Sequence, residues 1–133
     1  MTVFISQSNY IPWKGYFDAI RQADVFVLYD DMQYTKRDWR NRNQIKTPNG
    51  LQWLSIPVKV KGKYFQKINE TEVADQDWRQ SHWRSIVQNY RKAPFFPEYG
   101  PLFEALYTSA CETQLSQINF RFLKTIAGML GIN

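Results

Sequence analysis

The opening stretch MTVFISQSNYIPWKGYFDAIRQADVFVLYDD (residues 1–31) decides the expected fold. Residues 2–6 form a short apolar run of strand character, and residues 25–29 form a second one. Between them, residues 16–23 repeat apolar side chains at helical spacing. Strand, helix and strand in this order predict a parallel, right-handed βαβ start, and the continuous apolar character predicts strands buried on both faces.

The middle of the chain predicts a turn, a strand and a loop. Thr47-Pro48-Asn49-Gly50 is a strong turn signal, because Asn-Gly follows a proline. Residues 52–58 predict a strand that Pro57 ends or places at a sheet edge. Residues 59–67 predict an exposed basic loop around Gly62.

The C-terminal half is predicted to be helical. A first helix begins near Asp77, with Asp75 or Asp77 as its N-cap, and Pro94 and Pro97 break it. Further helices are predicted over residues 103–110 and 115–130, and Gly131 fits the end of the last one. The sequence contains no internal repeats and no convincing domain boundary. We therefore expect one α/β domain over residues 1–133, which would be incomplete at its C-terminus if the chain is a fragment.

Composition bounds the class of protein. A chain of 133 residues, of which 17% are aromatic, can bury a core and still line a partly wet cleft. No run reaches the roughly 18 apolar residues of a membrane helix, and no signal peptide is recognised. We therefore expect a cytoplasmic protein without a membrane span. The single cysteine, Cys111, is expected to be buried; no Cys/His cluster indicates a metal, and no cofactor is identified.

Positive charge is concentrated in one window. Residues 33–67 hold nine basic residues and one acid, a net charge of +8, whereas the whole chain carries +5. Such a patch attracts an anion, such as a phosphorylated substrate, nucleic acid or an acidic protein surface. The alternative is a solvated basic face.

Polar residues follow both predicted strands of the βαβ start. Gln7 and Asn9 come after the first strand, and Gln33 follows two acids after the second. Ligands of open α/β sheets bind outside the carboxyl ends of the strands, so these are candidate substrate-binding residues. Gly15 lies at the start of the helix, where free backbone N–H groups can bind an anion. The alternative is that the glycine only allows the strand and the helix to pack closely. Tyr16, next to it, is a candidate for lining the pocket.

Three side chains are candidates for catalysis. Asp30 and Asp31 suit a general base, an electrostatic partner or a divalent-ion ligand, although two acids also open turns. His82 is the only histidine, and the alternatives are a general base and a packed, hydrogen-bonded core residue.

The segment Arg37-Asp38-Trp39-Arg40-Asn41-Arg42-Asn43 is the most unusual one. Arginine binds phosphate or carboxylate with two parallel hydrogen bonds, and asparagine both donates and accepts. Trp39 and the earlier Trp13 offer planes for stacking, which nucleic-acid binding would also use. The candidate substrate-binding residues here are Arg40, Asn41, Arg42 and Asn43, and the alternative is a solvated loop.

A series of motifs resembles the WbqC-like protein family. The motifs are ISQSNYIPWKGYFD (residues 5–18), DDMQY (30–34), NRNQIK (41–46), TPNG (47–50), WLSIPV (53–58) and PFF (94–96). They are co-linear and cover nearly the whole chain. The resemblance implies a role in bacterial gene clusters for surface polysaccharide such as O-antigen, as a transferase, sometimes of an amino-acid group onto an amino sugar. It implies no established catalytic residues.

Two departures accompany the resemblance. Typical members are longer. We therefore expect a fragment, a natural short form, or a chain that forms half of a site which another chain completes, for example in a homo-oligomer. The strand, Pro-x-x-Gly turn and helix are similar to the start of nucleotidylyltransferase-like, Rossmann-like domains, in which two histidines at the turn hold a triphosphate. Residues 12–16 contain no histidine, which argues against that mechanism.

The leading hypothesis is a transferase, or its substrate-binding part, that acts on a nucleotide-linked amino sugar in bacterial polysaccharide assembly. The partner would then be an anionic small molecule. One alternative is a non-catalytic module that binds nucleic acid or another anion. The other is an inactive, truncated relative.

Overall fold

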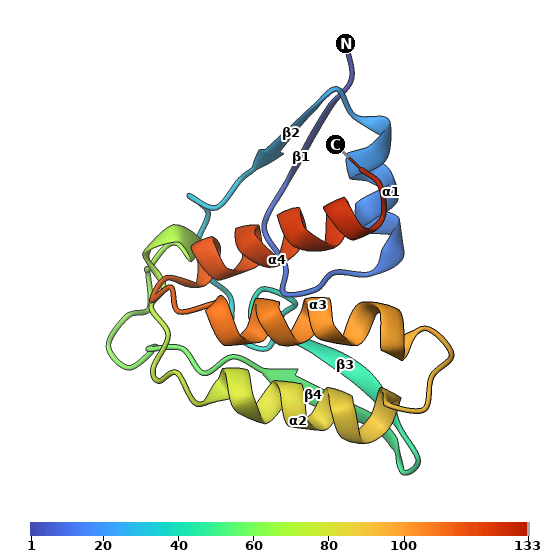
Figure 1. The fold of residues 1–133 in the computed structure, drawn as a ribbon. Helices are drawn as coiled ribbons and strands as arrows, with labels where there is room; N and C mark the ends of the chain where they lie inside the picture. The colour runs from blue at the N-terminus through green and yellow to red at the C-terminus, as the bar shows by residue number, and fades with distance from the viewer. Residues whose placement is uncertain (133) are drawn as a thin grey trace.

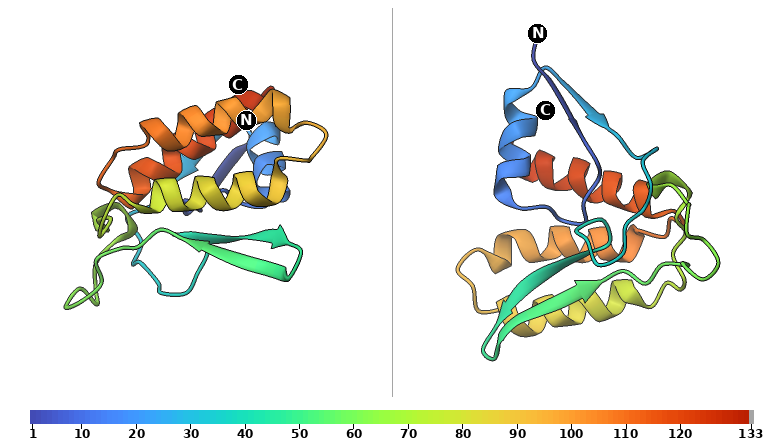
Figure 2. Two further views of the ribbon diagram at one scale, coloured as in Figure 1. Left: turned by 60° about the horizontal axis from the view of Figure 1, so that its bottom comes forward. Right: turned by 180° about the vertical axis from the view of Figure 1, so that it is seen from behind.

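A computed structural model describes residues 1–132, which form a mixed α/β fold. The elements in chain order are β1 (Val3–Ser6), α1 (Lys14–Gln22), β2 (Val25–Leu28), β3 (Arg42–Thr47), β4 (Gly50–Ser55), the 3₁₀ helix η1 (Ile68–Glu70), α2 (Trp78–Tyr90), α3 (Phe96–Ser109) and α4 (Leu115–Met129). The helices α2, α3 and α4 lie in front of the strands in Figure 1, and the strands lie in front when the molecule is seen from behind (Figure 2, right). The fold therefore has a helical layer and a layer that contains two small sheets.

The predicted order of strand, helix and parallel strand at the start of the chain is confirmed. β1 and β2 pair in parallel, from Val3 opposite Val25 to Ser6 opposite Leu28. The connecting helix α1 begins at Lys14, two residues before the predicted start. Tyr16 and Phe17 on its inner face join a cluster with side chains of α4, which holds the C-terminal helix against the N-terminal unit.

The prediction that these strands are buried on both faces is wrong. Val3, Ile5, Val25 and Val27 are 39–59% exposed. The opposite face carries Phe4 and Phe26, which stack on each other and pack with α1 and α4. A continuous apolar run is typical of a parallel strand, but the number of its faces that are buried depends on which helices pack against the sheet.

The second sheet is a hairpin. β3 and β4 pair antiparallel, from Arg42 opposite Ser55 to Thr47 opposite Gly50, and the predicted turn joins them. Gly50 adopts φ 109°, which a glycine accommodates without strain. The strand expected over residues 52–58 is β4, which begins and ends earlier, while β3 was not predicted because its polar sequence lacks apolar alternation.

The helices differ from the prediction mainly at their starts. α2 follows Asp77, which makes no capping bond; instead Asp75 Oδ1 accepts a hydrogen bond from the Asp77 N–H (2.9 Å). α2 ends at Tyr90, before Pro94 and Pro97, but α3 begins at Phe96, seven residues earlier than predicted. Pro97 lies in the first turn, where its missing N–H has no partner to lose. α4 matches its prediction, and Gly131 ends it at φ 74°.

The main core lies between the hairpin and the helical layer. Its fully buried side chains include Tyr10, Ile56, Leu115, Ile118 and Phe122. Cys111 is exposed after the end of α3, so the prediction of a buried cysteine is wrong. In the part of the chain that the structure describes, no helix combines the length and apolar character needed to cross a membrane.

Candidate functional site

A pocket of about 260 Å³ lies beyond the carboxyl end of β1, beside the start of the hairpin. Two chain segments form it. Asn9, Pro12 and Trp13 come from the turn between β1 and α1, and Trp39 and Asn43 come from the loop before β3 and from β3 itself. Amides and indole rings therefore face the same space.

Asn43 fixes the first segment. Its Nδ2 donates hydrogen bonds to the Ile11 carbonyl and, at 3.4 Å, to the Tyr10 carbonyl. Ile11 adopts φ 44°, a left-handed conformation that a β-branched residue rarely tolerates. Such a conformation persists only where surrounding contacts impose it, and it is commonest at binding sites. The Tyr10 N–H adds a bond to the Trp39 carbonyl (3.2 Å), which ties the two segments together.

Trp13 and Gly15 depend on each other. The Trp13 ring lies directly over Gly15, where a Cβ atom would come within 2.1 Å of the ring. Trp13 itself is 71% exposed. The glycine therefore provides room for the Trp13 ring over the first turn of α1, and the ring also lines the pocket.

Asp38 organises the second segment. Its carboxylate accepts hydrogen bonds from the Thr35 hydroxyl (3.0 Å) and the Trp39 N–H (2.8 Å). Burial acts to raise the pKa of Asp38, but these two bonds and the charges of Arg40 and Arg42 together lower it. The carboxylate is thus held in its ionised form beside the arginines.

Arg40 joins both segments from the side of Asn9. Its Nη1 donates to Asn9 Oδ1 and, at 3.4 Å, to the Ser8 carbonyl. Its Nη2 lies 3.7 Å from Asp38 Oδ2. The Nε atom is buried and has no hydrogen-bond partner among the described residues. Arg40 therefore positions Asn9 and places a largely buried positive charge behind this residue of the pocket wall.

A strip of aromatic and cationic side chains continues from the pocket. The Arg42 guanidinium lies 3.9 Å from the centre of the Trp53 ring, and its Nη2 donates to the Arg37 carbonyl (2.7 Å). The Trp53 and Trp39 rings lie 5.5 Å apart. Both indoles are more than 40% exposed. The strip offers ring faces and a positive charge to a ligand that extends from the pocket.

Asp30 and Asp31 have different surroundings. Asp30 is 4% exposed, and its carboxylate accepts hydrogen bonds from the Ser8 N–H (2.8 Å) and the Ser116 hydroxyl of α4. Asp31 is exposed. Neither side chain lines the pocket, and Asp30 instead ties the turn after β1 to α4.

His82 lies in the core and bonds at both ring nitrogens. Nε2 donates to the Ser55 carbonyl (2.9 Å), so Nδ1 accepts from the Tyr10 hydroxyl (2.8 Å), which in turn accepts from the Tyr107 hydroxyl. Burial lowers the pKa of His82 to about 4, although the bond to Ser55 acts to raise it. Burial also raises the pKa of Tyr10 and of Tyr107. A neutral imidazole thus connects the pocket turn, the hairpin and α3.

The remaining predicted residues are spread over other places. The Tyr16 hydroxyl donates to the Gln7 carbonyl (2.7 Å) inside the N-terminal unit, and burial raises the pKa of Tyr16 to about 12. Asn41 Nδ2 donates to the Ile56 carbonyl (2.9 Å) at the base of the hairpin. Gln33 Nε2 donates to the Tyr64 carbonyl (2.8 Å) in the basic loop.

Of the predicted site residues, Asn9, Trp13 and Asn43 therefore line the pocket. Arg40 does not line it but bonds to Asn9, Arg42 lies nearby on β3, and the other candidates lie elsewhere. Sequence reasoning missed Pro12 and Trp53. Trp53 carried only a strand signal, and its place beside Trp39 depends on the pairing of β3 with β4.

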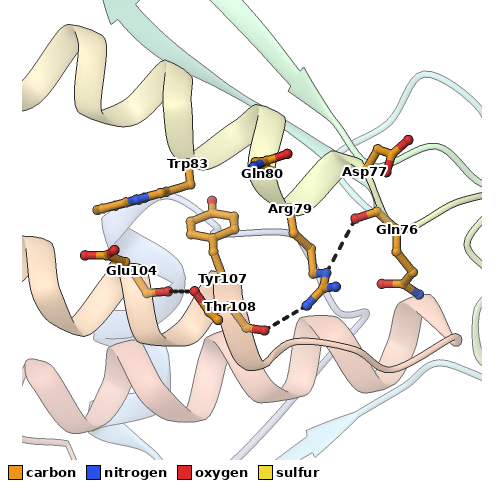
Figure 3. Close-up of a pocket in the computed structure, with 8 residues that line it drawn as sticks. All are labelled: Gln76, Asp77, Arg79, Gln80, Trp83, Glu104, Tyr107 and Thr108. Atoms are coloured by element: carbon orange, nitrogen blue, oxygen red, sulfur yellow. Dashed lines mark hydrogen bonds between the residues drawn. The ribbon is translucent and has the colours of Figure 1, made fainter.

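A larger cavity of about 410 Å³ lies between α2 and α3, and Figure 3 shows its lining. Arg79 extends from α2 toward the end of α3 and donates to the Thr108 carbonyl (2.8 Å) and the Gln76 carbonyl (3.5 Å). A cation on the last carbonyls of α3 is a helix-capping arrangement. None of the predicted site residues lines this cavity, so we do not take it as the candidate site.

Within residues 1–132, no group of three or more His, Cys, Asp or Glu side chains is arranged to hold a metal ion.

Comparisons with known proteins identify the family. The model of the WbqC-like protein family matches residues 7–133. An uncharacterised protein of Mycobacterium tuberculosis, Rv1507c, is 53% identical over 131 residues, which are 98% of this chain and 57% of that protein. The chain thus spans little more than half of this relative. No solved structure gives a significant match, so no structural neighbour supports the resemblance to nucleotidylyltransferase-like domains. The chain belongs to the WbqC-like protein family.

Proposed function

We propose that this chain is a transferase, or the substrate-binding part of one, that acts on a nucleotide-linked amino sugar in bacterial surface-polysaccharide assembly. One observation carries the proposal: Asn9, Trp13, Trp39 and Asn43, from two separate segments, line one pocket beyond the carboxyl end of a parallel strand. Family membership supports the reaction class, because the resemblance to this family implies a transferase role in gene clusters for surface polysaccharide.

The pocket is suited to one ring of such a substrate. Its volume of about 260 Å³ is slightly smaller than that of most small-molecule sites, which span roughly 300–1,000 Å³. An indole such as Trp13 or Trp39 packs against the apolar face of a sugar or base. The amide of Asn9, which Arg40 holds in place, then bonds ring hydroxyl or acetamido groups.

The positive charge near the pocket is suited to the diphosphate. Arg40 and Arg42 approach the pocket from the same loop and strand, and Asp38 compensates only part of their charge. Arginine favours phosphate because its guanidinium donates two parallel bonds. We expect the diphosphate to lie on the side of Arg42 and Trp53, where the aromatic strip is exposed.

Calorimetry with three probes tests the proposal: UDP-N-acetylglucosamine, UDP and N-acetylglucosamine. We expect the nucleotide-linked sugar to bind most tightly. Trp13→Ala and Arg42→Ala should each weaken binding by about tenfold, the value of one lost charge-assisted or stacking contact. Arg84→Ala, which removes an exposed arginine of α2, is the matched control and should bind like the unchanged protein. Absence of binding by all three probes, or equal loss in the control, contradicts the proposal.

A second function is favoured by the strip of Arg42, Trp53 and Trp39. Exposed indoles beside an arginine also stack the bases of single-stranded nucleic acid. A non-catalytic module of that kind would bind single-stranded RNA with an affinity that falls linearly with the logarithm of salt concentration. RNA binding that Trp53→Ala abolishes, without any binding of nucleotide sugars, would favour this second function.

A further inference from the structure

The loop from Lys59 to Lys67, called here the lysine–aromatic loop, lies apart from the candidate pocket. Its sequence is KVKGKYFQK. Tyr64 is 73% exposed and Phe65 is 87% exposed. Figure 2 (left) shows the loop projecting from the body of the molecule, at the end of the layer opposite the hairpin turn. Two neighbouring aromatic rings are thus presented to solvent among lysines.

The loop is held in this shape by its own hydrogen bonds. The Lys63 N–H donates to the Val60 carbonyl (3.0 Å), and Gly62 between them adopts φ 73°, as a tight turn requires. Gln66 is buried, and its Nε2 donates to the Lys59 carbonyl (3.0 Å). These bonds fix the base of the loop, so the exposure of its aromatic rings follows from the fold.

Contacts with the segment after β2 hold the other side of the loop. The Tyr34 N–H donates to the Gln66 carbonyl (2.9 Å), and Gln33 Nε2 donates to the Tyr64 carbonyl (2.8 Å). Lys36 borders the same surface depression as Lys63 and Tyr64. A further lysine from outside the loop therefore lies beside the aromatic tip.

Most of this positive charge is uncompensated. Among residues 1–132, the ion pair made by the loop is Lys59 Nζ with Glu72 Oε2 (3.0 Å). The other acid beside it, Glu70, accepts a bond from the Lys67 N–H (3.3 Å). Lys36, Lys61 and Lys63 are exposed and remain available to an anionic partner.

We propose that the lysine–aromatic loop docks on the surface of an anionic phospholipid bilayer. Phe65 and Tyr64 insert between the headgroups, and Lys36, Lys61 and Lys63 contact lipid phosphates. The exposed aromatic rings can enter the apolar region below the headgroups, and the lysines around them can bind the negatively charged lipid phosphates. The loop binds at the surface and does not span the bilayer.

The shape of the loop favours a membrane over nucleic acid. Sites for single-stranded nucleic acid are grooves in which successive rings form platforms, and arginine is the preferred cation. Here the rings lie on a projecting tip and the cations are lysines. The proposal is independent of the function proposed for the pocket, which lies among other residues.

Co-sedimentation with vesicles tests the proposal. The whole chain is mixed with vesicles of phosphatidylcholine alone and with vesicles that also contain phosphatidylglycerol. We expect binding only to the second kind, and we expect it to weaken as salt is raised. The double variant Tyr64→Ala/Phe65→Ala should bind about tenfold more weakly or worse. Lys61→Gln and Lys63→Gln should each weaken binding by about fivefold.

Matched substitutions elsewhere provide the control. Phe120→Ala removes an aromatic ring that is 52% exposed on α4, and Lys124→Gln removes an exposed lysine of the same helix. Both should leave vesicle binding unchanged. Equal binding to neutral and anionic vesicles overturns the proposal, as does no vesicle binding at all. Binding of single-stranded RNA that the loop variants abolish, with vesicle binding unaffected, also overturns it.

Discussion

Asn119 of α4 donates a hydrogen bond from Nδ2 to the backbone carbonyl of Arg40, at 2.9 Å. The same Nδ2 donates to Ser8 Oγ at 3.0 Å. Asn119 is fully buried, and Ser8 and Arg40 belong to the two segments that form the candidate pocket. One amide group from the last helix therefore fixes the distance between the two walls of the site.

Replacing Asn119 by alanine should destabilise the fold and loosen the pocket. Ser8 Oγ and the Arg40 carbonyl would lose their buried donor, which typically costs about 1–3 kcal/mol in free energy of unfolding. Urea denaturation should show this loss as a lower midpoint with an unchanged slope. Gln117→Ala on the exposed side of α4 is the control and should change stability by less than roughly 0.5 kcal/mol. Equal stability of the two variants would contradict the role of Asn119.

Neutralisation should lower the stability of the protein at Asp30 but not at Asp31. Asp30→Asn weakens the bonds from the Ser8 N–H and the Ser116 hydroxyl, and bonds to a charged group contribute about 1.5–3 kcal/mol each. We expect the free energy of unfolding to fall by roughly 2 kcal/mol. Asp31→Asn is the matched control at an exposed neighbouring position and should leave stability unchanged. Urea denaturation of both variants under the same conditions measures these differences. An Asp30→Asn variant as stable as the unchanged protein would exclude a structural role for Asp30.

The fold could be predicted from sequence where local signals agree with tertiary contacts. β1, α1 and β2 follow from two apolar runs around a helical stripe, and Pro48-Asn49 marks the hairpin turn. β3 could not be predicted, because its polar residues form a strand only through pairing with β4. α3 was predicted to start too late, because Pro97 breaks a helix interior but fits a first turn.

The site could be predicted only in part for the same reason. Asn9 and Asn43 were found because polar residues after a strand and an arginine-rich segment are local features. Trp53 reaches the site through the register of the hairpin, and Asn119 through the packing of α4. The only sequence signal for Asn119 is a polar residue on the apolar stripe of a helix, next to Ile118 and Phe122.

Gly15→Ala should affect binding more than stability. The new Cβ would come within 2.1 Å of the Trp13 ring, but this ring is an exposed side chain that can rotate away. Alanine also favours a helix by about 1 kcal/mol over glycine. We therefore expect unchanged or slightly higher stability in thermal unfolding, and weaker binding of UDP-N-acetylglucosamine in calorimetry. Gly128→Ala in α4, where a Cβ meets no neighbour, is the control. Lower stability together with unchanged binding would contradict this view of Trp13.

His82 should make the stability of the protein depend on pH between about 6.5 and 4. In the unfolded chain a histidine binds a proton below about pH 6.5, whereas burial lowers the pKa of His82 in the folded chain to about 4. The unfolded state thus binds more protons in this window, so the free energy of unfolding falls as the pH is lowered. Above pH 6.5 the contribution is complete, and over the whole window the loss amounts to about 3 kcal/mol.

Urea denaturation of the unchanged protein and of His82→Gln, measured from pH 7.5 to pH 4.5, checks this expectation. Glutamine removes the titrating group, so the variant should be less stable at pH 7.5 but should lose less stability on acidification. The difference between the two pH profiles isolates His82 from the carboxylates that both proteins share. Parallel profiles would mean that His82 has the same pKa in the folded and unfolded chains, which would contradict its burial as a neutral imidazole between Tyr10 and Ser55.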